Sequence, residues 1–325
     1  MYDESMFFVG PAEGECTAPL LFPATQPLSL RTATHEFVFE EGRDFALDSD
    51  AGIVTRLSGS RIPCTPQDEV PGLICEKDDD FHRRQVSATY AHVPGTWNGY
   101  TPAFAGGQMP RTLRRLAASE PLRLAITGDS ISEGYNASEF ILAPPWQPAY
   151  GPLVAAGLEQ GYGSRVELHN CAVAGWTSDD GLADVGRVAA RDPNLVIVAY
   201  GMNDAGYAAP ADFARNVSGI IDAVRSTSPL AEFVVVSPML PIAEPDDHAL
   251  MRFPAYRDAL LALCGDGVVL ADLTTLWADL LGRKRGYDIT GNGLNHPNDF
   301  GHRVYAQVIL ALLVARDRLT AVVGK

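Results

Sequence analysis

The stretch LRLAITGDSISEGYNAS, residues 122–138, runs from an apolar segment into a polar one that begins at Gly128-Asp129-Ser130. Similar apolar runs recur as RVELHNCAV (165–173), NLVIVAYG (194–201), EFVVVSPM (232–239) and GVVLADL (267–273). Helix-like stretches alternate with these runs, at residues 149–158, 210–226, 250–263 and 301–319. Continuous apolar strands that alternate with helices predict an α/β domain whose parallel sheet is covered on both faces.

The chain before this region has a different pattern. Short β-type runs such as PLLF, LSLRTA and GIVTRL are separated by turn residues, and no convincing helix interrupts them. Many short strands with Gly and Pro between them favour a β-sandwich. We therefore expect two domains, an N-terminal β-sandwich over residues 1–115 and an α/β domain over residues 116–325.

The composition limits the classes of partner. Hydrophobic residues make up 46% of the chain and charged residues 20%, and the formal net charge is −15. So acidic a protein is expected to bind neither nucleic acid nor anionic membranes, and no apolar run approaches the roughly 20 residues that span a bilayer. The segment MYDESMFFVG lacks the basic and apolar regions of a signal peptide. We expect a cytoplasmic protein, or a secreted one if the sequence is a mature form without its leader.

Four residues that carry chemistry follow the elements of the α/β region. Ser130 follows the first strand, Gly175 the second and Asn203 the third, while His296 precedes the last helix. In an open parallel sheet, ligands bind beyond the carboxyl ends of the strands. The topology therefore predicts that these residues gather at one edge of the sheet.

The order Gly-Asp-Ser, Gly, Gly-x-Asn-Asp and His-Pro resembles the SGNH (GDSL-type) hydrolase superfamily, over residues 122–319. The resemblance implies a flavodoxin-like three-layer domain with a five-stranded parallel sheet, and hydrolysis of esters without a cofactor or metal. It assigns Ser130 as the nucleophile and His296 as the base that takes the serine proton. The oxyanion hole would comprise the backbone N–H groups of Ser130 and Gly175 and the side-chain amide of Asn203.

The last block departs from the pattern of the superfamily. The usual form is Asp-x-x-His, in which a carboxylate orients the imidazole, and here that position is Gly293. We expect a Ser–His dyad in which a backbone carbonyl accepts the Nδ1–H of the histidine. Asp288 or Asn292 are alternatives if the glycine-flanked loop folds back, and Asp299 is another.

Two aromatic residues flank the candidate site in sequence. Tyr135 follows the nucleophile and either borders the substrate pocket or shapes the turn. Trp176 follows Gly175 and is either a platform for a sugar ring or part of the core. Asp204 is expected to start a helix, and the acidic run EKDDDFH (76–82) is expected to be solvated and to bind no metal.

An N-terminal β-sandwich before an SGNH domain is similar to certain two-domain carbohydrate acetyl-esterases with a jelly-roll domain. The resemblance implies removal of acetyl groups from sugars, oligosaccharides or polysaccharide fragments. One alternative is a general short-chain esterase, thioesterase or lipase. Another is a non-catalytic carbohydrate-binding protein on the same scaffold. The expected partners are a small-molecule or carbohydrate ester and, as an open alternative, a second copy of the chain in a homo-oligomer.

Overall fold

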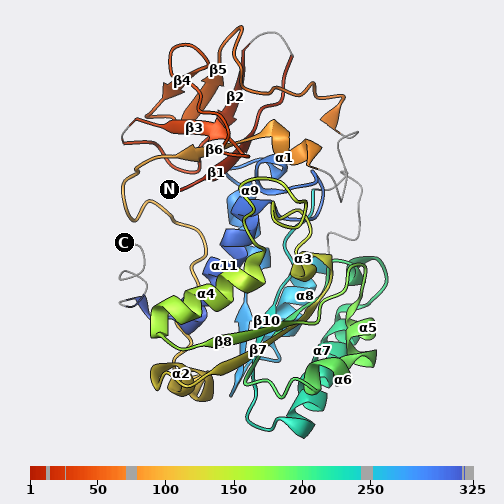
Figure 1. Ribbon diagram of the computed structural model, residues 1–325. Coiled ribbons are helices and arrows are strands. Elements are labelled where there is room, and N and C mark those ends of the chain that lie inside the picture. Colours follow the sequence, from red (N-terminus) through yellow and green to blue (C-terminus); the bar gives the residue numbers. More distant parts are fainter. Residues whose placement is uncertain (12–14, 26, 71–78, 243–251, 317, 319–325) are drawn as a thin grey trace. The chain divides into compact units, whose positions relative to one another are not determined.

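The computed structural model describes residues 1–325 except 12–14, 26, 71–78, 243–251, 317 and 319–325 (Figure 1). The packing of its backbone divides the chain into two compact units. Unit 1 comprises Met1–Tyr100, Tyr135–Pro148 and Ala278–His302, and unit 2 comprises Thr101–Gly134, Ala149–Trp277 and Arg303–Lys325. The division runs through two helices, α9 (Leu273–Leu281) and α11 (Asp299–Leu313).

Unit 2 contains a five-stranded parallel sheet in the order β11-β10-β9-β7-β8, the flavodoxin-like arrangement. Its strands are β7 (Leu122–Gly128), β8 (Val166–Asn170), β9 (Leu195–Ala199), β10 (Glu232–Val236) and β11 (Val268–Ala271). Its remaining elements are α2 (Pro110–Ala117), α3 (Ser130–Glu133), α4 (Tyr150–Tyr162), α5 (Ser178–Ala183), α6 (Val185–Ala189), the 3₁₀ turn η2 (Asp204–Gly206), α7 (Pro210–Thr227) and α8 (Arg252–Leu261). The five strands confirm the fold class that the apolar runs predict.

Helices cover both faces of this sheet, as the unbroken apolar strands require (Figure 1). On one face, Val196, Val198 and Phe233 belong to a core cluster with side chains of α6, α7 and α8. On the other face, α4 lies so close that a Cβ added at Gly151 would be 2.6 Å from Ile126 Cδ1. Helix α11 packs on α4 in the same layer, since a Cβ at Gly157 would be 2.5 Å from Leu310 Cδ1. Three layers result.

The register of the sheet aligns the ends of the central strands. Gly128 at the end of β7 pairs with Ala199 at the end of β9, and Ile126 pairs with Asn170 at the end of β8. The loops that follow these strands therefore leave from the same edge of the sheet. This confirms the topological reason for expecting the serine, glycine and asparagine blocks together.

Unit 1 contains two three-stranded antiparallel sheets, in the orders β1-β6-β3 and β2-β5-β4. The strands are β1 (Glu4–Phe7), β2 (Cys16–Pro19), β3 (Ser29–Thr32), β4 (Phe45–Asp48), β5 (Ile53–Arg56) and β6 (Gln85–Thr89). The strands confirm the β-rich N-terminal part. Two short helices also belong to this unit, α1 (Asp80–Arg84) and α10 (Gly286–Ile289), and α1 corrects the expectation of no helix in this part.

The segments Tyr135–Pro148 and Ala278–His302 pack with Met1–Tyr100, although they come from the later part of the chain. A buried ion pair illustrates this packing: Lys284 Nζ lies 2.6 Å from Glu4 Oε1, and both side chains are fully buried. The boundary expected between residues 115 and 116 stays a prediction. Among the residues that the structure describes, no helix has the length and apolar character needed to cross a membrane.

Candidate active site

Ser130 occupies the first position of α3, immediately after β7. Asp129 caps this helix, because its carboxylate accepts a hydrogen bond from the Ile131 N–H at 3.0 Å. Gly134 ends the helix with φ 118°, in the left-handed region that glycine adopts without a steric penalty. The turn therefore holds Ser130 at the start of a helix, where backbone N–H groups have no partner inside the helix.

Gly128 is required by the close packing beneath this turn. A Cβ at this position would lie 2.3 Å from Ser132 Oγ and 2.6 Å from the carbonyl oxygen of Ala199. Any larger residue would push β7 away from β9 or displace α3. The glycine of the Gly-Asp-Ser triplet thus has a packing function that is separate from the chemistry of the serine.

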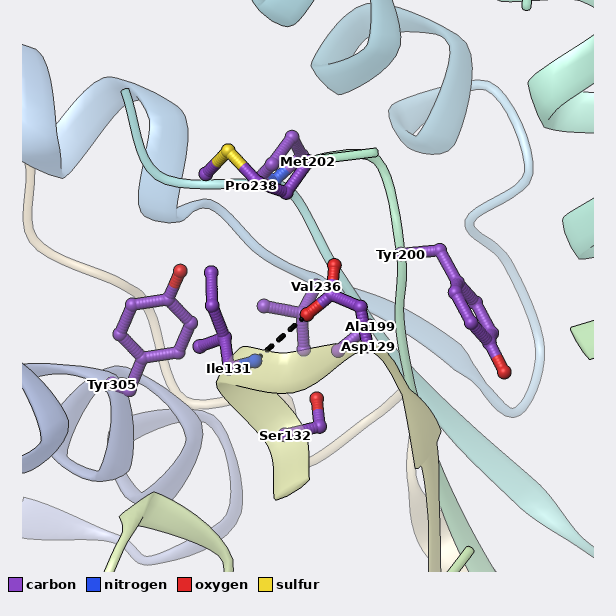
Figure 2. Close-up of a pocket in the computed structure, with 9 residues that line it drawn as sticks. All are labelled: Asp129, Ile131, Ser132, Ala199, Tyr200, Met202, Val236, Pro238 and Tyr305. Carbon is purple, nitrogen blue, oxygen red and sulfur yellow. Dashed lines mark hydrogen bonds between the residues drawn. The ribbon is translucent and has the colours of Figure 1, made fainter. Parts of the chain in front are cut away.

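A small cavity lies beside the Asp129 carboxyl group (Figure 2). Its volume is about 10 Å³, room for roughly one water molecule and no substrate. The lining residues are Asp129, Ile131, Ser132, Ala199, Tyr200, Met202, Val236, Pro238 and Tyr305. Burial in this apolar surrounding raises the pKa of Asp129 to about 7.

The loop after β8 carries Gly175, which has φ 81° and is exposed. Two side chains tie this loop to the turn that carries Ser130. Asn170 Nδ2 donates to the carbonyl of Ser132 at 2.7 Å, and Glu133 Oε2 accepts from the Ala174 N–H at 2.7 Å. The backbone that presents the Gly175 N–H is therefore anchored directly to α3.

Asn203 is held at the end of β9 by the same loop. Its Nδ2 donates to the carbonyl of Trp176 at 2.9 Å. The next residue, Asp204, is buried and accepts from the backbone N–H groups of Ser178 at 3.0 Å and Gly201 at 3.1 Å. Asp204 starts η2, as expected, and in addition joins the glycine loop to the asparagine turn.

His296 lies in unit 1, in a loop closed by a bridge between Thr290 and Pro297 and by the hydrogen bond from the Gly291 N–H to the His296 carbonyl. Its Nδ1 lies 2.9 Å from Asn136 Oδ1 and 3.2 Å from Asn292 Nδ2. Burial lowers the pKa of His296 to about 4, so the imidazole is neutral at pH 7. A neutral imidazole is the form that can accept a proton.

The candidates for orienting His296 have different positions. Of the side chains expected there, Asn292 lies at Nδ1, and the amide of Asn136, which the sequence did not suggest, lies closer. Asp288 is buried and accepts from the Phe7 N–H at 2.7 Å and the Arg285 N–H at 2.9 Å. Asp288 therefore caps α10 and holds β1.

The other two candidates also have packing roles. Gly293 has φ 68°, and a Cβ there would lie 2.8 Å from the Phe81 ring, so the usual aspartate cannot occupy this position without a shift of the ring. Asp299 accepts from the Ser138 N–H at 2.8 Å.

The two aromatic candidates have defined surroundings. The ring of Tyr135 meets the His296 ring edge-on at 5.3 Å between centroids. The backbone carbonyl of Tyr135 lies 3.1 Å from His302 Nε2. Trp176 packs against the core cluster of unit 2, and the Arg187 guanidinium lies 5.4 Å from its ring centroid.

Sequence reasoning missed Glu133, Asn136 and Asn170. A polar residue three to six positions from Ser130 or Gly175 was the only signal, and it carries little information by itself.

Unit 2 thus combines an αβα sheet with a serine turn, a glycine loop and an asparagine turn that hydrogen bonds connect to one another. No group of acidic, histidine and cysteine side chains in the described part of the chain could hold a metal ion. The connected serine, glycine and asparagine turns are the arrangement that the SGNH pattern predicts for an ester hydrolase.

Comparisons with known proteins extend this assignment. Residues 126–304 match the model of the GDSL-like Lipase/Acylhydrolase family. The chain belongs to this family. A comparison with curated protein sequences gives no match.

Two solved structures share the fold. One is a two-domain esterase (CEX) active on acetylated mannans, with a TM-score of 0.50 and 22% identity over 70% of this chain and 56% of that one. The other is a variant of Axe2, an acetyl-xylooligosaccharide esterase from Geobacillus stearothermophilus, with a TM-score of 0.50 and 19% identity over 59% of this chain and 94% of that one. The chain thus spans about half the length of the two-domain esterase that it matches.

Proposed function

We propose that the protein is a serine esterase that removes short acyl groups, above all acetyl groups, from sugars, oligosaccharides or polysaccharide fragments. Ser130 is the nucleophile and His296 the base in this proposal. The observation that carries it is the connected set in unit 2, where Glu133 and Asn170 anchor the glycine loop to the serine turn. Such anchoring holds the oxyanion donors in place before the reaction begins.

The proposed reaction has two halves. Ser130 Oγ attacks the ester carbonyl while His296 Nε2 accepts the hydroxyl proton, and the oxyanion receives hydrogen bonds from the Ser130 and Gly175 N–H groups and the Asn203 amide. The bond to the alcohol oxygen then breaks, and the imidazolium returns its proton to the leaving alcohol. Water attacks the acyl-serine in the same way, which releases the carboxylic acid and restores the hydroxyl.

Support for a short acyl group comes from the residues around the turns. Thr177 and Ser178, which follow the glycine loop, are small and polar, whereas a long acyl chain calls for an apolar lining. The two-domain esterase and Axe2 act on acetylated mannans and acetyl-xylooligosaccharides respectively, which motivates the choice of a sugar as the alcohol. Both likenesses are of fold, so the substrate rests on experiment.

The nucleophile is tested with p-nitrophenyl acetate. We expect Ser130→Ala to lower kcat by about 10⁴ or more, because no other group can form the acyl intermediate. Ser132→Ala is the matched control, since this neighbouring hydroxyl is paired with Tyr150 Oη at 2.7 Å. Equal activity of Ser130→Ala and the wild type would show that Ser130 is not the nucleophile.

The substrate class is tested by measuring acetate release from acetylated xylan, acetylated mannan and monosaccharide acetates. A parallel series of p-nitrophenyl esters from acetate to decanoate separates an acetyl-esterase from a general esterase, and we expect kcat/KM to fall steeply beyond butyrate. Activity on the nitrophenyl esters with no acetate from any carbohydrate would support the general esterase. No hydrolysis at all, together with binding of the oligosaccharides, would support the carbohydrate-binding alternative.

A further inference from the structure

Two asparagine amides meet the Nδ1 atom of His296, where the family pattern would place a carboxylate. Asn292 belongs to the same loop as the histidine, and Asn136 is 160 residues away in the sequence. Both asparagines and the histidine are at least 98% buried and belong to unit 1. The chemistry of this contact depends on which amide atom faces the ring, and the neighbouring hydrogen bonds decide it.

The orientation of Asn292 is set by its own loop. Its Oδ1 accepts from the backbone N–H groups of Leu294 at 3.0 Å, Asn295 at 3.1 Å and His296 at 3.1 Å. The amide nitrogen must therefore face the ring, and it also has Asn295 Oδ1 as an acceptor at 3.1 Å. Asn292 is thus a donor that has a partner besides the imidazole.

The orientation of Asn136 is opposite. Its Nδ2 donates to the carbonyl of Gly291 at 3.3 Å, so its Oδ1 faces His296 Nδ1 at 2.9 Å. Its backbone has φ 62°, a left-handed conformation that asparagine tolerates better than most residues. Gly291 permits the close approach, because a Cβ there would lie 2.6 Å from Asn136 Cβ.

A ring nitrogen carries either a proton or a lone pair, so Nδ1 satisfies one asparagine at a time. If Nδ1 carries the proton, it donates to Asn136, and Nε2 keeps a lone pair that can accept a proton from a serine hydroxyl. If Nδ1 accepts from Asn292, the proton sits on Nε2 and the imidazole cannot act as a base there. The shorter distance, to Asn136, favours the first tautomer.

We propose that Asn136 is the positioning residue that holds His296 in the Nδ1–H tautomer, so that a neutral amide replaces the usual carboxylate. The proposal rests on the proposed function, in which His296 is the base. It replaces the backbone carbonyl that the sequence led us to expect. A neutral acceptor fixes the tautomer without adding a negative charge that would stabilise the imidazolium.

The neutral partner has a consequence for the pH dependence of the reaction. In the described part of unit 1, the Tyr135 ring meets the His296 ring edge-on at 5.3 Å, and burial lowers the pKa of the neighbouring His302 to about 4. A carboxylate at position 136 would favour the charged ring, so Asn136→Asp should move the acid limb of kcat/KM to higher pH by about one to three pH units.

Three variants test the proposal by kinetics. Asn136→Gly removes the acceptor and keeps the left-handed backbone, and Gly291→Ala displaces Asn136 through the added methyl group. We expect each to lower kcat on p-nitrophenyl acetate at least about tenfold with little change in KM. Asn136→Asp should retain activity at neutral pH with the shifted acid limb. Asn295→Asp is the charge control, because it adds a carboxylate in the same loop at a side chain that bonds Asn292, and its acid limb should shift less.

A second measurement does not depend on activity. In protein labelled with ¹⁵N-histidine, the His296 signals, assigned with His296→Gln, should show a protonated Nδ1 and an unprotonated Nε2 at pH 7. In Asn136→Gly the two tautomers should mix. A protonated Nε2 in the wild type, or an unchanged spectrum in Asn136→Gly, would overturn the proposal. The expected spectra in a protein that hydrolyses no ester would instead refute the proposed function and leave the tautomer assignment standing.

Discussion

At the scale of single residues, the amide of Asn203 is the clearest case of a side chain whose surroundings define its task. The Trp176 carbonyl holds one amide hydrogen at 2.9 Å, which fixes the direction of the other. Asp204 fixes the backbone of the same turn through the Gly201 N–H. An amide held in this way suits the proposed role of a preorganised donor to the oxyanion.

The test of this donor is Asn203→Ala. Because the amide would stabilise charge that develops only in the transition state, we expect kcat to fall by about 10²–10³ while KM changes little. Asn194→Ala is the matched control. Asn194 lies just before β9, at the end of the strand opposite to Asn203, and its amide oxygen accepts from the Arg123 N–H at 2.9 Å. A rise in KM alone, with kcat retained, would contradict the assignment.

The sequence allowed Ser130, Gly175, Asn203 and His296 to be proposed because each belongs to a block of adjacent residues at a recognisable position relative to a strand or helix. Asn136 could not be proposed in the same way. It acts through its left-handed backbone, its bond to Gly291 and the absence of a Cβ at that glycine. No short motif encodes that combination.

At the scale of elements, the junction of β7 and α3 places a carboxyl group in an apolar cavity. Asp129 caps α3 through the Ile131 N–H, yet only 2% of its surface is exposed. Burial raises its pKa from 3.8 to about 7, and the charge of Asp204 acts in the same direction. The cap is therefore obtained at a cost in electrostatic free energy at neutral pH.

This cost gives a pH-dependent stability. The folded protein binds the Asp129 proton more tightly than the unfolded chain does. The stabilisation that this proton binding gives the folded state is therefore complete below about pH 4 and is lost as the pH rises to about 7. The free energy of unfolding should fall by at most about 4 kcal/mol over that interval from this group. The buried His296 and His302 act in the opposite direction, because burial lowers the pKa of each to about 4.

Asp129→Asn isolates the effect. An amide can still accept from the Ile131 N–H and carries no charge, so we expect the variant to be more stable than the wild type at pH 8 and equal to it near pH 4. Urea unfolding at a series of pH values measures the difference. Asp179→Asn, at an exposed carboxylate in the first turn of α5, is the control for loss of one charge. A constant difference between Asp129→Asn and the wild type from pH 4 to pH 8 would contradict the raised pKa.

The elements themselves were largely predictable, because periodicity and apolar runs are local signals. All five strands of the parallel sheet lie inside the runs quoted from the sequence, and α7 (Pro210–Thr227) coincides with the expected helix to within one residue. The short α1 (Asp80–Arg84) was missed, because five residues give too little pattern and its acidic start reads as a solvated loop.

At the scale of the whole molecule, each compact unit is assembled from three separate segments of the chain. In unit 1, Lys284 from the third segment donates to Glu4 Oε1 at 2.6 Å and to the Pro19 carbonyl at 2.7 Å. Glu4 also accepts from the Leu21 N–H at 2.8 Å and from the Tyr90 hydroxyl. A buried ion pair in which both partners make further hydrogen bonds therefore joins the third segment to the β-rich first segment.

Removing one partner of this pair should be costly. We expect Lys284→Met to lower the free energy of unfolding by about 3–5 kcal/mol, because it leaves the Glu4 carboxylate buried without a cation. Chemical denaturation measures the loss. The double variant Glu4→Gln with Lys284→Met removes both charges and should recover part of the stability. A loss as large in the double variant as in Lys284→Met would show that packing, and not the unpaired charge, is responsible.

The family, the parallel sheet and the order of the serine, glycine, asparagine and histidine blocks follow from the sequence alone, because strands, turns and motifs are encoded by neighbouring residues. The tertiary structure decided two further matters. It placed Tyr135–Pro148 and Ala278–His302 with the β-rich segment, and within that unit it brought Asn136 to His296 across 160 residues. Contacts between distant residues depend on the path of the whole backbone, so only the folded chain shows that the imidazole meets an amide where the motif lacks its aspartate.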